Sequence, residues 1–335
     1  MTGLGCYSAL SGQEKAKGLF ARALRAGRLP HAYLFRGPDG VGKRLFAVGV
    51  AMAINCRARE GERACGRCSS CRKYMSGNHP DLVCISPLKG TIRIEQIRLL
   101  GGELGYPPLE AAMRVIIVED THTMRREAAN SLLKTLEEPP ADNLLILTAD
   151  ASRELLPTLM SRCQVLPFAP LQRRQAALVL QGHGIPAEEA LQLAELAEGS
   201  PGRALALKDS GMVPLWREVV DLLDEPRPAA DGEVGAVLRA AEKMAALKEN
   251  LPAFFGLLRQ WLRSRLVEAC GAAPPGEERA ARKCWSSAEL FATLQAISRA
   301  EEELARNCSR NLVCEVLLFR LQGARDGYPS GAGRA

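Results

Sequence analysis

Residues 37–44 read GPDGVGKR, which departs at one position from the phosphate-loop pattern G-x-x-x-x-G-K-[ST]. Gly37, Gly42 and Lys43 fit the pattern, but Arg44 stands where a hydroxyl would hold Mg²⁺. Backbone N–H groups of such a loop attract phosphate, and the lysine adds a positive charge. Because arginine cannot ligate a metal, we expect catalysis to be lost sooner than phosphate binding. An empty loop kept as a relic of the fold is the alternative.

The second chemical feature is the acid pair Glu119–Asp120, which ends the apolar run RVIIVED. In phosphate-cleaving folds the first acid after such a strand helps to hold Mg²⁺ and the second activates water, usually in the order Asp-Glu. The reversed order displaces each carboxylate by about one methylene, and an error of ~1 Å can cost on the order of 10² in rate. Together with Arg44, the reversal predicts a degenerate ATPase site.

The third feature is a group of four cysteines with the spacing C-x8-C-x2-C-x2-C: Cys56, Cys65, Cys68 and Cys71. Four thiolates so spaced can enclose one tetrahedral Zn²⁺ in a closed structural site. The insert 56–71 has few apolar residues, so a metal would have to replace a core. A redox-active pair and replacement of one ligand by His79 are the alternatives. The basic residues of the insert predict a solvated charged surface rather than a nucleic-acid contact.

These groups need a sheet to position them. Apolar runs predict strands at 32–37, 81–86, 114–120, 143–150 and 164–170, and the helices between them predict an α/β fold with a parallel sheet covered on both faces. A helix over 43–56 completes the strand, loop and helix order that a phosphate loop requires. Residues 171–209 predict three short helices, 225–233 a surface loop, and most of the rest of the chain helices with apolar faces.

Composition excludes a membrane protein. The 335 residues carry a net charge of +6, with 47% apolar and 24% charged residues, which is ordinary for a globular chain of two or three domains. No apolar run is long enough to cross a bilayer, and the first residues do not resemble an export signal. We therefore expect a cytoplasmic protein.

Several segments together resemble the clamp-loader branch of the AAA+ ATPases. They occur in the family's order over about residues 8–207: HAYLFRGPDGVGK, the four-cysteine insert, VIIVEDTHTM, NSLLKTLEEPP, LLPTLMSRCQ and EGSPGRAL. The resemblance implies an AAA+ P-loop domain at 1–170 with a zinc insert at 56–71, a helical lid domain at 171–209, a helical oligomerisation (collar) domain at 210–323, and a flexible tail at 324–335.

The resemblance also implies roles for single residues. Arg162, in the Ser-Arg-Cys motif, matches an arginine that acts in trans on a neighbour's ATP, and Arg203 matches the lid arginine that senses nucleotide. Thr148 and Asp150 both compete for the polar sensor that ends the strand. The remaining matches are the phosphate loop (Gly37, Gly40, Gly42, Lys43 and the altered Arg44), the two acids (Glu119 and Asp120) and the zinc ligands (Cys56, Cys65, Cys68 and Cys71).

The family offers two functions. The altered Arg44 and the reversed acid pair favour a stator, which caps the ring and supplies Arg162 while a sliding clamp is loaded onto primed DNA. The implied partners are the gamma/tau motor subunits, the delta subunit, the clamp and, through the complex, DNA. Structural zinc is the expected cofactor, and bound ATP or ADP is not excluded. The alternatives are an active gamma/tau-like motor and, more distantly, a zinc-containing DNA-binding module. The resemblance places the chain in a replicative DNA polymerase complex, but we do not expect the chain itself to carry the polymerase activity.

Overall fold

The computed structural model describes residues 6–58, 64–224, 231–269 and 285–325. The chain divides into two compact units, residues 1–205 and 206–335, and each has its own hydrophobic core. The first unit holds the sheet and most of the expected lid, and the second is helical. The expected fold class, an α/β P-loop domain with a cysteine insert, a helical lid and an all-α C-terminal part, is confirmed.

A five-stranded parallel sheet organises the first unit, in the order β2-β3-β4-β1-β5. The strands are β1 (Ala32–Arg36), β2 (Leu82–Ile85), β3 (Arg114–Val118), β4 (Asn143–Ala149) and β5 (Gln164–Pro167). The chain leaves β1 for the edge strand β2, returns through β3 and β4, and adds β5 on the other side of β1. The carboxyl end of β1 is therefore the topological switch point, where open α/β sheets bind ligands.

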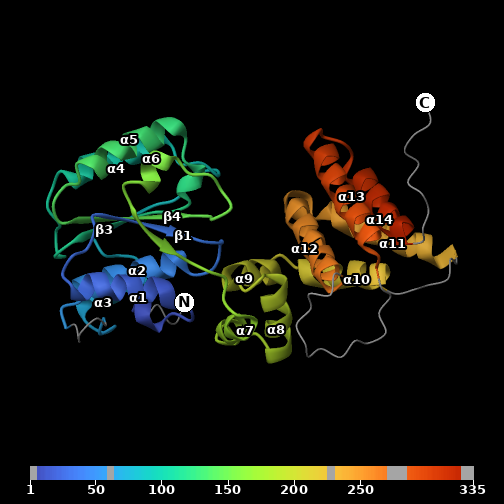
Figure 1. Cartoon of the computed structure of the whole chain (residues 1–335), viewed down its shortest axis with the longest axis horizontal. Helices are drawn as coiled ribbons and strands as arrows, with labels where there is room; N and C mark the ends of the chain where they lie inside the picture. Colours follow the sequence, from blue (N-terminus) through green and yellow to red (C-terminus); the bar gives the residue numbers. More distant parts are fainter. Residues whose placement is uncertain (1–5, 59–63, 225–230, 270–284, 326–335) are drawn as a thin grey trace. The chain divides into compact units, whose positions relative to one another are not determined.

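Alternate side chains of the central strands enter cores on opposite faces of the sheet. On β1, Tyr33 and Phe35 pack with helices α1 (Glu14–Arg25) and α2 (Lys43–Asn55), whereas Leu34 faces the other core. That second core includes α4 (Ile94–Leu104) and α5 (Arg126–Glu137). Figure 1 shows these two helix layers on either side of the strands. Burial on both faces explains why the strands read as continuous apolar runs.

Three helices of the first unit were not among the sequence predictions: α3 (Ser69–Ser76), α4, and the short α6 (Pro157–Met160). Helix α3 begins within the cysteine insert, where the Sγ of Cys68 accepts the backbone N–H of Cys71 at the helix N-terminus. The helix therefore starts at the group of thiols.

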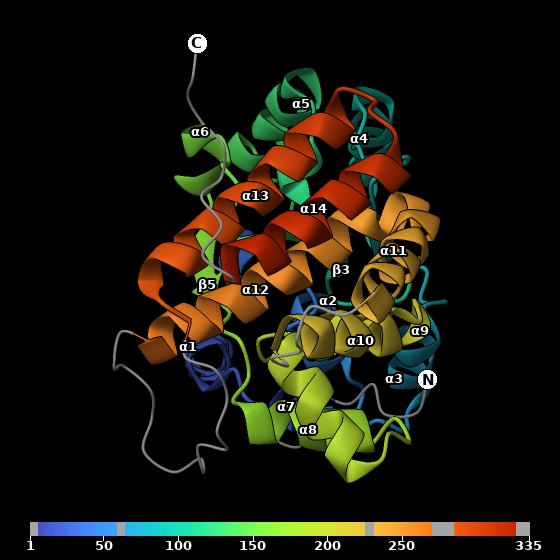
Figure 2. The same cartoon turned by 90° about the vertical axis from the view of Figure 1, so that its right-hand side faces the viewer.

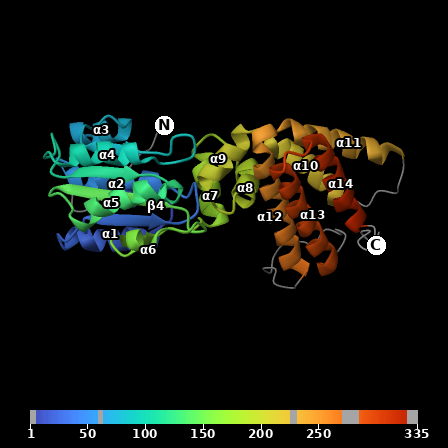
Figure 3. The same cartoon turned by 90° about the horizontal axis from the view of Figure 1, so that it is seen from above.

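The predicted lid helices are present as α7 (Arg173–Gln181), α8 (Ala187–Leu196) and α9 (Pro201–Asp209), and they gather into one group (Figure 3). Gly199, at φ +74°, passes so close to Leu171 that a Cβ would lie 2.0 Å from its carbonyl oxygen. The backbone N–H of Leu171 donates to the Gly199 oxygen at 2.9 Å. Gly199 therefore allows the segment before α9 to pack against Leu171, the first residue of the predicted lid.

The second unit is built of α10 (Met212–Asp224), α11 (Asp231–Ala246), α12 (Leu251–Ala269), α13 (Ser287–Ala305) and α14 (Arg310–Arg325). Figure 2 shows α13 and α14 running side by side. The loop predicted at 225–233 is wrong at its end, because α11 already begins at Asp231; residues 225–230 lie outside the described residues. Helix α14 continues to Arg325, two residues into the predicted tail, and 326–335 are not described. Among the described helices, none has the length and apolar character needed to cross a bilayer.

Candidate functional site

The phosphate loop joins β1 to α2 at the carboxyl edge of the sheet, and the ends of β3 and β4 lie at the same edge. Gly40 and Gly42 have φ angles of +74° and +96°, a region that favours glycine. Lys43 is buried, and its Nζ donates to the carbonyl oxygens of Gly37 at 2.7 Å and Pro38 at 2.8 Å, and to Asp39 Oδ1 at 3.3 Å. The Lys43 ammonium group thus lies inside the loop, at the place where a bound phosphate would lie next to it.

Arg44 and Glu119, the two departures from the catalytic pattern, contact each other. The Nε of Arg44 lies 2.7 Å from Oε1 of Glu119. The contact is an ion pair rather than an aligned hydrogen bond, since within the described chain no donor is directed at this buried oxygen. A Mg²⁺ ion does not fit here, because the guanidinium offers no lone pair and already neutralises the carboxylate.

The polar residues at the end of β4 are used locally. Thr148 Oγ1 accepts the backbone N–H of Asp120 at 3.1 Å, which holds Asp120 in its left-handed conformation at φ +49°. Burial alone would raise the pKa of Asp150, but hydrogen bonds from the N–H and hydroxyl of Ser152, with the charge of Lys43, outweigh it and leave the pKa lowered. Thr148 therefore positions Asp120, Asp150 is a carboxylate whose charged form is favoured, and both residues stay candidates for the sensor.

The lid touches the phosphate loop directly. Ser200 Oγ donates to the Asp39 oxygen at 2.6 Å, and the N–H of Gly202 donates to the Gly40 oxygen at 2.9 Å. Arg203 follows in α9, and its Nη1 lies 3.9 Å from Glu198 Oε2 with both side chains more than half exposed. The loop and the candidate sensor arginine thus belong to one continuous arrangement within the first unit.

Arg162 lies just after α6, away from the phosphate loop of its own chain. Its Nη2 contacts Glu137 Oε1 at 2.6 Å, and its Nη1 donates to the Thr158 oxygen at 3.1 Å. The side chain is about one third exposed. Glu137 holds the Arg162 guanidinium at the surface. The sequence analysis did not identify Glu137 as a site residue, although it lies in the family segment NSLLKTLEEPP.

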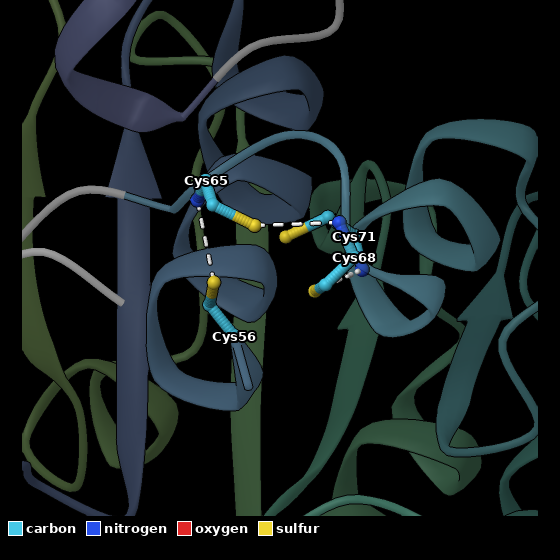
Figure 4. Close-up of side chains that lie close together, drawn as sticks. All are labelled: Cys56, Cys65, Cys68 and Cys71. Atoms are coloured by element: carbon cyan, nitrogen blue, oxygen red, sulfur yellow. Dashed lines mark hydrogen bonds between the residues drawn. The ribbon is translucent and has the colours of Figure 1, made fainter. Parts of the chain in front are cut away.

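The four cysteines of the insert come together as predicted. Their sulfur atoms all lie within 4.8 Å of one another, and Figure 4 shows the four side chains converging. Four thiolates about 2.3 Å from one Zn²⁺ would be about 3.8 Å apart, so the group fits a tetrahedral metal. Backbone N–H groups of Cys65, Cys68 and Cys71 donate to the sulfurs of Cys56, Cys65 and Cys68 at 3.2–3.4 Å. Residues 59–63 of the insert are outside the described chain.

Those N–H groups favour thiolates. Burial would raise the pKa of Cys68, but hydrogen bonds, chiefly from the backbone N–H groups of Cys71 and Arg57, lower it to about 6. Backbone hydrogen bonds also lower the pKa of Cys65. Burial raises the pKa of both Cys56 and Cys71. A dication among the four sulfurs would favour the charged form of each, so metal binding and thiol deprotonation reinforce each other.

His79 is not a zinc ligand. Its Nδ1 accepts the backbone N–H of Asp81 at 3.1 Å, its Nε2 faces Ser70 Oγ at 3.5 Å, and its ring stacks on Tyr74 with the centroids 3.9 Å apart. The alternative in which it replaces a cysteine is therefore wrong. Glu110 offsets part of the positive charge around the insert, since it pairs with Lys73 at 2.5 Å and lies 3.9 Å from Arg57.

Comparisons with known proteins agree with this geometry. The sequence model of the family described as DNA polymerase III, delta subunit, matches residues 12–172. The delta prime subunits of DNA polymerase III from Bacillus subtilis and Pseudomonas aeruginosa are 39% identical over 160 residues and 36% identical over 196 residues. The chain resembles the clamp-loader delta prime subunit. The tau subunit of Escherichia coli is 35% identical over 212 residues, 62% of this chain and 33% of tau.

The match covers part of each protein. It takes in 48% of the Bacillus delta prime subunit and 60% of the Pseudomonas one, so the chain spans about half to three fifths of these relatives. Both shares exceed that for tau, which favours a delta prime-like chain over a tau-like one. A solved DNA polymerase III gamma subunit-related protein of Thermotoga maritima covers 93% of this chain and is itself covered completely, with 18% identity and a TM-score of 0.47. At that level of likeness the fold assignment rests on the sheet itself.

Proposed function

We propose that this chain is a delta prime-like subunit of the DNA polymerase III clamp loader, a stator that caps the AAA+ ring in the cytoplasm. The observation that carries the proposal is the Arg44–Glu119 ion pair in an otherwise well-formed phosphate loop. A chain that has replaced its metal site with an internal ion pair cannot turn over ATP in the ordinary way, so its contribution to the ring is positional.

In this proposal Arg162 completes a neighbour's ATP site. An arginine supplied in trans stabilises charge that develops on the transferred phosphoryl group. Glu137 holds the Arg162 guanidinium at the surface until the more highly charged phosphate of a gamma/tau motor subunit competes for it. ATP binding by the ring would open the sliding clamp and grip primed DNA, and hydrolysis would release both. The delta subunit is the remaining ring partner.

The other sequence-predicted residues keep supporting roles. Gly37, Gly40, Gly42 and Lys43 shape the phosphate loop, and Arg203 of the lid is the nucleotide sensor. Glu119 and Asp120 are the remnant of the catalytic acids. Cys56, Cys65, Cys68 and Cys71 hold a structural Zn²⁺ that takes the place of a hydrophobic core in the insert.

The test is DNA-stimulated ATP turnover of the reconstituted loader with Arg162→Ala in this chain only. We expect turnover to fall about tenfold or more, because arginines in this role contribute on the order of 10³ or more at a single site. Arg153→Ala, which removes an exposed arginine of the same unit, is the matched control. Unchanged turnover in a ring that still assembles would exclude the stator role.

An active gamma/tau-like motor is the second candidate, favoured by the intact Lys43 and by the similarity to tau. It requires that this chain hydrolyse ATP itself. If this chain is a motor, Lys43→Ala in this chain should measurably lower the ATP turnover of the loader. If it is a stator, the same substitution should leave that turnover unchanged.

A further inference from the structure

We propose that Arg44 takes the place of Mg²⁺ in this site, so that the loop takes a nucleoside di- or triphosphate as a metal-free anion. The proposal rests on the proposed function only in using the same loop as its nucleotide site, and it does not depend on the role of Arg162.

The metal is excluded by charge and by ligand chemistry. Mg²⁺ requires near-octahedral oxygen ligands at about 2.0–2.1 Å and gives up its water reluctantly. Arg44 cannot accept a hydrogen bond or ligate a metal, because a guanidinium has donors and no acceptor. Its Nε lies 2.7 Å from the Glu119 oxygen that the metal would need, so a dication on that oxygen would meet a fixed positive charge.

The same arginine can serve the phosphates. A guanidinium has five N–H donors in a planar fork that matches phosphate oxygens. The Nε of Arg44 contacts Glu119, the guanidinium also interacts with the side chain of Cys84, and 60% of the Arg44 side chain remains exposed at the first turn of α2. Lys43 is the adjacent residue, and two of its three contacts are with neutral carbonyl oxygens of the loop. Lys43 and Arg44, each paired with one carboxylate, thus take the positions that a lysine and a metal have in an active site.

Glu119 fits the same account. A free carboxylate at the end of β3 would repel a phosphate, which is why catalytic folds place a metal between them. Here the Arg44 charge neutralises Glu119 internally. Arg44 therefore offsets the charge of Glu119 that a metal would otherwise offset, so the two residues act together.

The experiment is calorimetric titration of ADP into the full chain, once in EDTA and once in excess Mg²⁺. We expect binding in EDTA, and weaker apparent binding in Mg²⁺ because the metal competes for the ADP phosphates. Arg44→Ser should weaken binding in EDTA about tenfold or more, since a hydrogen bond from a charged donor is lost. Arg98→Ser, at an exposed arginine of α4, should leave it unchanged.

A variant that rebuilds the metal site separates this proposal from a simple basic pocket. Arg44→Thr with Glu119→Asp and Asp120→Glu restores the usual ligands, and ADP binding should then become dependent on Mg²⁺. Wild-type chain that binds ADP only with Mg²⁺, or that is folded and binds none in EDTA, would overturn the proposal. Neither result bears on the Arg162 measurement, so the stator can fail or stand independently.

Discussion

The approach of the lid to the phosphate loop is decided by two glycines. A Cβ at Gly40 would lie 2.5 Å from Ser200 Oγ and 2.7 Å from the backbone nitrogen of Arg203, and Gly202 lies against Gly40 in the same way. Gly42 has a positive φ as well, but a Cβ there would meet nothing within 4 Å. Gly40 is therefore needed both for the close contact with the lid and for its positive φ, whereas Gly42 is needed for its positive φ alone.

This difference gives a matched pair of variants. Gly42→Ala should destabilise the first unit by about 1–2 kcal/mol through the left-handed backbone. Gly40→Ala should cost about 1–3 kcal/mol more, because the methyl group must also push the lid from the loop. Amide hydrogen exchange of α7–α9 measures the effect, and faster exchange should appear in Gly40→Ala alone. Equal exchange in both variants would show that the lid does not rest on the loop.

Asp81 predicts a pH dependence at the start of β2. It is fully buried and accepts the backbone N–H groups of residues 109–111 at 2.7–2.9 Å, and Arg114 Nε lies 3.8 Å from its Oδ1. Burial alone would raise its pKa, but the three N–H groups outweigh burial and the pKa is lowered. A lowered folded pKa stabilises the fold fully above the ordinary value of 3.8, and this stabilisation is lost as the pH falls through the folded value.

Asp81→Asn should therefore destabilise the sheet by about 3 kcal/mol at pH 7, because an NH₂ group replaces one of the two carboxylate oxygens that accept the three buried backbone N–H groups. The gap between the variant and the wild type should narrow as the pH falls below 3.8. Hydrogen exchange of β2 and β3 across this range measures it, with the exposed Asp142→Asn as control. A gap independent of pH would mean that the carboxylate charge is not what stabilises this corner.

At the scale of single residues, composition and spacing identified the chemical groups but not their pairings. The sequence marked Arg44 and Glu119 as two separate defects, because the residues are 75 positions apart and only the sheet joins them. The partnership of Arg162 with Glu137 was hidden for the same reason. The four cysteines were predictable as a group because they are close in sequence and share one ligand chemistry.

At the scale of elements, all five strands were predictable because a parallel sheet buried on both faces leaves apolar runs in the sequence. Helix α4 was missed although Ile97, Leu100 and Leu104 form a buried face, because Gly101 and Gly102 interrupt it. Helix α3 was missed because its polar sequence packs around Cys71 and Tyr74 rather than along an apolar stripe. Short helices with polar or glycine-rich sequences depend on tertiary contacts that spacing does not reveal.

The insert predicts a metal-dependent element. Cys68→Ser should remove bound Zn²⁺ from the purified chain, because three thiolates and a hydroxyl do not reproduce the closed site. Loss of the metal should increase hydrogen exchange in α3, which starts at Cys68. Metal content by mass spectrometry is the measurement, and Cys308→Ser, at an exposed cysteine of the second unit, is the control. Zinc retained at one equivalent in Cys68→Ser would place the ion elsewhere.

At the scale of the whole molecule, the chain has separate cores for its two units, and sequence motifs inform only the first. The core of residues 206–335 draws on all of α10–α14, including Phe254, Phe255 and Trp261. Its helices were predictable from their apolar faces, but no residue pattern in them specifies a partner. The collar role rests on the family resemblance, and it needs a test at this scale.

That test separates the units. All three tryptophans lie in the second unit, so their fluorescence follows its unfolding alone. We expect residues 206–335 expressed alone to unfold cooperatively at the same urea concentration as in the full chain, because this core needs no residue of the sheet. If this unit is the oligomerisation domain, the fragment should also co-elute with the gamma/tau subunits, whereas residues 1–205 should bind them more weakly. The reverse order of binding would assign assembly to the ATPase-like unit and remove the collar from the proposed function.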